Sequence, residues 1–147
     1  MIASLLFVHI LAAVIWVGGM FFAHQMVRPS VAPLDAPVRL ALWRRIFERF
    51  FRWVWAAALL LLVTGTGMET TGIRGLHVTI MEILGIVMVL AFAHLYFAPW
   101  KRFRRAVDSG DFPAAAVQLN RIRRIVELNL ALGLIVVVVG ATGRYWS

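Results

Sequence analysis

The chain has 147 residues, of which 62% are apolar and 15% charged, and its mean hydropathy is +0.85. A soluble domain carries about half apolar and about a quarter charged residues, so this composition indicates one membrane domain over residues 1–147. The absence of cysteine excludes disulfides, zinc–thiolate sites and covalently attached haem. The net charge of +8 comes from residues that alternate with long apolar runs, which argues against nucleic acid as a partner.

The first predicted element is a transmembrane helix over residues 2–27. This run contains no Asp, Glu, Lys or Arg and exceeds the roughly 20 residues that cross a bilayer core. It lacks the basic start and the short apolar core of a secretory signal. We therefore expect it to remain in the membrane.

The second predicted span covers residues 50–68, with Arg52 reaching from it to the membrane interface. An amphipathic pattern over residues 38–53 precedes it. This pattern predicts an interfacial turn or two that leads into the span, with an apolar face made of Leu42, Ile46 and Phe50.

The third and fourth predicted spans cover residues 76–100 and 123–143. All five prolines fall at or outside the span ends, where lost helix hydrogen bonds matter least. No internal repeat is apparent, and the loops are too short to form a catalytic domain. The predicted fold is therefore all-α, an integral membrane four-helix bundle.

The distribution of Lys and Arg predicts the orientation of this bundle. Residues 28–52 hold six of them and residues 99–124 hold seven, so 13 of the 15 lie in two loops on one side. Such loops face the cytoplasm. We therefore expect both termini and the loop at residues 69–75 to lie outside, in a bacterial-type cytoplasmic (inner) membrane.

All four histidines lie in two of the predicted spans, His9 and His24 in the first, His77 and His94 in the third. Ionisable residues inside a span are costly and usually serve a function, although they also serve as hydrogen-bonding groups between helices. At a rise of about 1.5 Å per residue, His24 and His94 lie near one level in the inner leaflet. Two histidines on facing helices at one depth suit bis-imidazole ligation of haem b. The predicted depths of the outer pair, His9 and His77, agree less well.

Copper is the alternative cofactor, through two helical stripes that contain methionine. The first stripe holds His9, Trp16 and Met20, and the second holds His77, Met81 and Met88. Imidazole and thioether ligands suit copper, especially Cu(I). A methionine row at helical spacing also arises from plain packing, and this interpretation stays open.

Several other residues stand out in or beside the spans. Glu82 lies inside the third span, where it could pair, carry a proton or line a pocket, whereas Glu127 is expected to pair with Arg123 one turn away. Three arginines sit where haem propionates or quinone headgroups would be met, namely Arg49, Arg52 and Arg124. Six glycines are expected to permit close helix packing: Gly18, Gly19, Gly65, Gly67, Gly133 and Gly140.

The chain resembles the superfamily of CopD-like copper-resistance membrane domains and the related HemJ-type protoporphyrinogen oxidases. The likeness covers nearly the whole chain through short motifs: His9 followed by Trp16-Val17-Gly18-Gly19, Arg44-Arg45-Ile46-Phe47, Thr64-Gly65, Gly75-Leu76-His77, and Arg123-Arg124 with Glu127-Leu128. The HemJ branch implies haem b on His9 and a lysine early in the third span. Thr79 stands at that position, which argues against oxidase activity.

The leading hypothesis is a haem b-binding membrane protein that acts in electron transfer or haem-linked redox chemistry. Its cofactor-binding residues would be His9, His24, His77, His94, Trp16 and Arg52. The alternative is a CopD-type protein for copper uptake or handling, with ligands among His9, His77, His94, Met20, Met81 and Met88. A structural subunit is the third hypothesis. The expected partners are the lipid bilayer, a quinone or redox protein, and a second copy of the chain.

Overall fold

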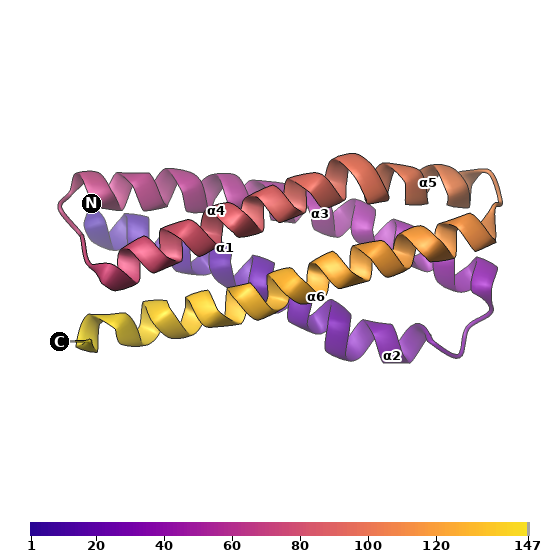
Figure 1. Cartoon of the computed structure of the whole chain (residues 1–147), viewed down its shortest axis with the longest axis horizontal. Coiled ribbons are helices and arrows are strands. Elements are labelled where there is room, and N and C mark those ends of the chain that lie inside the picture. Colours follow the sequence, from indigo (N-terminus) through magenta and orange to yellow (C-terminus); the bar gives the residue numbers. More distant parts are fainter. Residues whose placement is uncertain (147) are drawn as a thin grey trace.

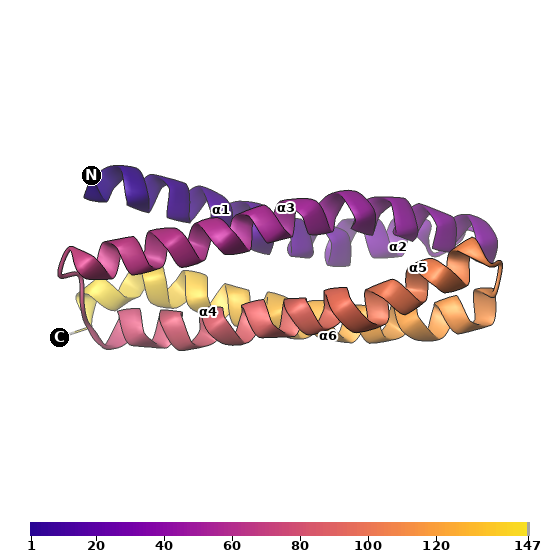
Figure 2. The ribbon, with the colours of Figure 1, turned by 90° about the horizontal axis from the view of Figure 1, so that it is seen from above.

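The computed structural model describes residues 1–146, which form an elongated bundle of helices with no β-strand in that range (Figure 1). This confirms the all-α prediction. Four helical rods run along the bundle, and both termini lie at the end that also holds the turn between the second and third rods (Figures 1 and 2). The rods comprise α1 (Ile2–Phe22), η1 (Ala23–Val27) and α2 (Arg28–Val31); α3 (Ala36–Thr70); α4 (Leu76–Leu95), η2 (Tyr96–Trp100) and α5 (Lys101–Asp108); and α6 (Phe112–Thr142) with η3 (Gly143–Tyr145).

Three of the four rods are long and apolar enough to cross a membrane: Ile2–Val31, Leu76–Asp108 and Phe112–Tyr145. Apolar side chains cover their outer surfaces because lipid replaces water there. The remaining rod, α3, is 35 residues long, but arginines occupy its first half and its apolar stretch is short. The protein is thus an integral membrane four-helix bundle.

The helices continue beyond the predicted spans at the basic end of the bundle. The predicted spans 2–27 and 76–100 coincide with α1–η1 and α4–η2, but α2 and α5 extend these rods without a break. The amphipathic segment is likewise the first half of α3 and not a separate interfacial turn. Its buried face differs slightly from the predicted one and consists of Leu40, Trp43, Phe47 and Phe51.

Aromatic packing explains why this extension is helical. The ring of Phe47 on α3 stacks between those of Trp43 and Phe51, with centroids 4.8 and 5.1 Å away. Its edge contacts Trp100 and Phe103 of the third rod at 6.1 and 6.2 Å. Such aromatic pairs stabilise the fold beyond the effect of the apolar area that they bury. The basic end therefore has an aromatic core of its own.

A π-helical turn interrupts the first rod at Ala23–Val27 and the third rod at Tyr96–Trp100. A proline lies two residues after the first turn, at Pro29, and inside the second, at Pro99. Proline lacks the amide hydrogen and its ring clashes with the carbonyl four residues earlier, and the wider π turn accommodates both effects. Pro99 therefore lies within a continuous helix instead of ending it.

Glycines allow close contact at particular helix crossings. A Cβ on Gly133 of α6 would lie 2.8 Å from Val17 Cγ2 and 3.2 Å from Met88 Cε, so α1, α4 and α6 meet at this point. A Cβ on Gly19 would overlap the ring of Phe50. Gly18 has nothing within 4 Å, so the expectation that it permits close packing is wrong.

The bundle is a tandem repeat of two helical hairpins, which the sequence alone did not make apparent. The first hairpin pairs the rod of α1 with α3, and the second pairs the rod of α4 with α6. Both run in the same direction, as expected for a repeat about an axis along the membrane normal. Three motifs recur in order: His-x4-Pro, Asp-x-Pro and Arg-Arg-Ile-x-Glu, at residues 24–29, 35–37 and 44–48 of the first hairpin and 94–99, 111–113 and 123–127 of the second.

Candidate functional site

His9 on α1 is half-buried and faces α3. Its Nδ1 atom lies 2.7 Å from Oγ1 of Thr64, which is itself buried. The Thr64 hydroxyl also lies 2.6 Å from the carbonyl oxygen of Leu60. When it donates its single proton there, it accepts from His9 Nδ1–H. The ring is then held in the tautomer whose Nε2 carries a free lone pair. Metal-binding histidines commonly have this arrangement.

The stripe predicted on α4, namely His77, Met81 and Met88, faces glycines of α6 and η3. His77 packs against Gly143, because a Cβ added to this glycine would overlap the Cβ of His77. The Sδ atom of Met81 would lie 3.0 Å from a Cβ on Gly140, one turn farther into the bundle. Met88 follows at Gly133. The imidazole and both thioethers thus line one helix interface, in a row that runs from the start of α4 to the buried middle of the bundle.

The stripe on α1 has a packing role in its inner part. Trp16 and Met20 are each 2% exposed, and the Trp16 ring contacts the edge of Phe92 on α4 with centroids 6.0 Å apart. Phe92 in turn contacts Phe51 and Trp55 of α3. Trp16 therefore belongs to the aromatic core at the centre of the bundle.

His24 lies in the π turn η1 and faces α6. Its Nδ1 atom is 3.7 Å from Oε1 of Glu127, and the same oxygen accepts a hydrogen bond from Nη1 of Arg28 at 2.5 Å. Glu127 therefore pairs with Arg28 of the other hairpin. The one-turn spacing had predicted a pair with Arg123 instead. The guanidinium of Arg123 lies instead over the Trp43 ring, 5.7 Å from its centroid.

His94 lies on the other side of α6. A small cavity beside His24 is lined by Arg123 and Val126, whereas a larger one beside His94 is lined by Arg121, Arg124 and Ile125. At 3.6 residues per turn, these two groups occupy opposite faces of α6. The two histidines, predicted to lie near one level, do not share a cavity, because depth along the membrane does not determine the direction in which a side chain points.

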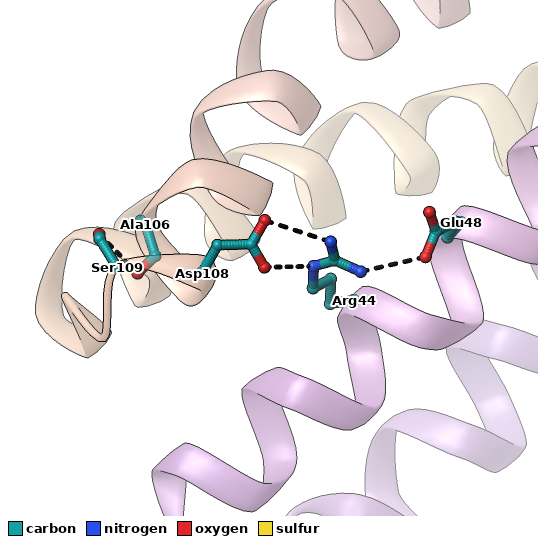
Figure 3. Close-up of polar contacts among 5 residues, drawn as sticks. All are labelled: Arg44, Glu48, Ala106, Asp108 and Ser109. Carbon is teal, nitrogen blue, oxygen red and sulfur yellow. Dashed lines mark hydrogen bonds and ion pairs between the residues drawn. The ribbon is translucent and has the colours of Figure 1, made fainter.

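A second polar contact joins the hairpins at the basic end (Figure 3). Arg44 on α3 reaches Asp108 at the end of α5 with Nε 2.8 Å from Oδ1 and Nη2 3.2 Å from Oδ2, while its Nη1 donates to Glu48 at 3.0 Å. The hydrogen bond with Asp108 raises the pKa of Arg44 above its ordinary value. Each Arg-Arg-Ile-x-Glu motif thus contacts the short helix of the other hairpin, through Arg44 in one case and Glu127 in the other.

The other predicted residues stay apart from these contacts. Arg52 and Glu82 are exposed and form no salt bridge with any of residues 1–146. Over the same residues, no three His, Asp or Glu side chains converge on one point. Methionine thioethers are further candidate ligands beside the histidines.

The comparison with known proteins was decisive for the family. The model of copper resistance protein D matches residues 44–142, which is two-thirds of the chain. The chain belongs to the copper resistance protein D family. No curated protein and no solved structure matches it.

The family match confirms the CopD part of the resemblance and supports the copper alternative over haem. It includes His77, Met81, Met88 and His94, whereas His9, Trp16, Met20 and His24 precede it. No match supports the HemJ branch, and Thr79 in the described structure is an exposed residue of the first turn of α4.

The two inner histidines do not fit a bis-histidine haem. The cavity at His24 has a volume of about 20 Å³, room for a water molecule, and the cavity at His94 has about 360 Å³ but contains only one histidine. An iron needs its two axial imidazoles on opposite sides of one ring. Since α6 lies between His24 and His94, these residues do not meet that requirement.

Two polar residues in the interior of this family member were missed as functional candidates. Thr64 appeared only as part of a motif, although a threonine one helix away from a half-buried histidine is a residue type that can set a tautomer. Asn129 is 2% exposed and donates from Nδ2 to the carbonyl oxygen of Met88 at 3.1 Å, while its Oδ1 has no partner among residues 1–146. An amide inside a predicted span was the signal that could have identified it.

Proposed function

We propose that this protein handles copper as cargo in a cytoplasmic membrane, taking it up from the outer side. Membership of the copper resistance protein D family supports the choice of metal. The ligand types agree with it, because the interior offers imidazole and thioether groups and the chain has no cysteine. These soft and intermediate ligands favour Cu(I) over hard cations such as Mg²⁺ and Ca²⁺.

His9 is the ligand for which the geometry gives the strongest argument. Its bond to Thr64 leaves Nε2 as the free lone pair, and an outer hydrogen bond of this kind orients a metal-binding ring and raises its basicity. This hydrogen-bonded pair is the single observation that carries the ligand assignment.

The row of His77, Met81 and Met88 would supply the successive positions. At about 1.5 Å per residue, these groups are spaced roughly 6 and 10 Å apart along α4. They begin at the end of the bundle that holds both termini and finish at the buried centre. Such spacing suits transfer of a soft cation between low-coordinate positions rather than storage in one closed site.

The test is Cu(I) binding by the detergent-purified protein, measured under anaerobic conditions against a chromophoric Cu(I) chelator. We expect stoichiometric Cu(I) in the wild type. His9→Ala, and the double variant His77→Ala with Met81→Leu, should each weaken binding by at least about tenfold because a ligand is lost. Matched controls are His94→Ala and Met26→Leu, whose side chains are exposed outside the proposed row.

Two results would contradict the proposal. One is equal Cu(I) affinity in the wild type and in both ligand variants. The other is a stoichiometric haem spectrum, a sharp Soret band that shifts on reduction, in protein that contains no copper. The second result would support haem-linked redox chemistry instead.

A further inference from the structure

An open cavity at the basic end of the bundle is strongly positive. It has a volume of about 360 Å³ and lies between the third rod and α6. Three arginines line it, Arg102 from α5 and Arg121 and Arg124 from α6, together with His94 of α4. Pro99 and Ile125 form part of its apolar wall.

These three arginines have no acidic partner within residues 1–146. Three carboxylates of the basic end are paired with other arginines, because Glu127 binds Arg28 and both Asp108 and Glu48 bind Arg44. Guanidinium groups that converge without a counter-charge repel one another, and a bound anion removes that repulsion. Guanidinium groups also present paired N–H donors that match the oxygens of a phosphate group.

The surface next to this cavity is apolar, which distinguishes a lipid from a free anion. Leu90 lies one turn before His94 on α4, and Leu128 lies one turn after Arg124 on α6, so both continue the face of the cavity toward the membrane centre. Their side chains are 63% and 53% exposed. A ligand that fills the whole surface therefore has an anionic head and an apolar tail.

We propose that this cavity binds the phosphate group of an anionic phospholipid, with the acyl chains lying over Leu90 and Leu128. Basic pockets between helices at a cytoplasmic membrane face bind such headgroups. The lipid would hold the third rod and α6 together at the π turn η2. The inference does not depend on copper.

The test is lipid retention measured by native mass spectrometry on the full chain purified in mild detergent. Phosphatidylglycerol and phosphatidylcholine are added at equal concentration, and the bound fraction of each is compared. We expect the wild type to retain phosphatidylglycerol preferentially. The variant Arg121→Gln with Arg124→Gln should lose roughly 25-fold in its affinity, about fivefold for each arginine removed near the membrane surface.

The matched control is Arg104→Gln with Arg105→Gln. It removes the same charge from the same basic end of the bundle, but these two residues of α5 do not line the cavity. It should retain phosphatidylglycerol within about twofold of the wild type. Equal losses in both double variants would overturn the proposal, since the attraction would then be general surface charge.

Inorganic phosphate tests whether the cavity binds a free phosphate ion instead of a phospholipid headgroup. Without lipid, millimolar phosphate should not raise the apparent Tm of the wild type beyond a chloride solution of equal ionic strength. A rise that disappears in the Arg121 and Arg124 variant, without any preference for phosphatidylglycerol, would overturn the lipid assignment. If the double variant fails to fold, Arg121→Gln and Arg124→Gln are tested singly, each with an expected loss of about fivefold.

Discussion

The imidazole of His9 and the hydroxyl of Thr64 form a hydrogen bond of 2.7 Å between α1 and α3, across 55 positions of sequence. When the Thr64 hydroxyl donates its own proton to the Leu60 carbonyl, it accepts the hydrogen bond from His9 Nδ1–H. A single hydroxyl thereby determines which nitrogen of the ring is available. Within the first hairpin, the ring also packs beside Gly65 of α3, where an added Cβ would lie 3.8 Å from His9 Cε1.

Replacing Thr64 with valine should weaken Cu(I) binding without unfolding the protein. Valine has nearly the same shape but no oxygen, so His9 loses the group that fixes its tautomer and orientation. Loss of an outer hydrogen bond of this kind lowers metal affinity by about 10- to 100-fold. The measurement is the chelator competition, with circular dichroism as a check on helix content. Thr64→Ser keeps the acceptor and should restore most of the affinity; if serine binds no better than valine, the hydrogen bond has no such role.

Gly133→Ala should destabilise the bundle, whereas Gly18→Ala should not. The added methyl group would come 2.8 Å from Val17 Cγ2 and 3.2 Å from Met88 Cε at Gly133, but would meet nothing at Gly18. Overpacking of this kind costs about 1–3 kcal/mol, while alanine gains up to about 1 kcal/mol in helix propensity at an open position. Thermal unfolding in detergent measures both. Equal Tm values for the two variants would show that the three helices do not meet at Gly133.

The course of the helices through the membrane was predictable to a large extent. The charge-free run at 2–27 and the apolar run at 76–100 define α1–η1 and α4–η2 because burial in lipid leaves no tolerance for charge. Beyond the membrane, apolar content decreases and only periodicity remains. The prediction therefore missed that α3 begins at Ala36, where a buried aromatic face and not lipid stabilises the helix.

An ion pair holds the two hairpins together at the basic end, and its contribution to stability should be small. Arg44 and Asp108 are 26% and 54% exposed, so water and salt screen their attraction. A double-mutant cycle with Arg44→Gln and Asp108→Asn should give a coupling of about 0.5 kcal/mol, which decreases at high salt. A coupling above about 2 kcal/mol would mean that this contact is shielded from solvent. Arg45→Gln, which removes an exposed neighbour, is the control.

The candidate site was only partly predictable, because helical spacing constrains neighbours on one helix but not partners on another. The row of His77, Met81 and Met88 was correctly read as one face of α4, and it faces α6. The sequence also predicted one level for His24 and His94, but these residues line different cavities on opposite faces of α6. Rotation about each rod depends on packing and on the π turns, and spacing does not reveal it.

Asn129→Leu should leave stability nearly unchanged, whereas Asn129→Asp should lower it strongly. The amide is buried and makes one hydrogen bond, Nδ2 to the carbonyl oxygen of Met88, while Oδ1 has no partner among residues 1–146. Leucine has a similar volume and removes both the one hydrogen bond, which contributes about 1 kcal/mol, and the unpaired Oδ1, so the two effects offset each other to within about 1 kcal/mol. Aspartate would bury a charge with no cation beside it, which costs several kcal/mol. Thermal unfolding of both variants in detergent measures the difference. A large loss with leucine would indicate that Oδ1 has a partner, such as an ordered water or a bound cation, and Cu(I) binding by this variant would then distinguish the two.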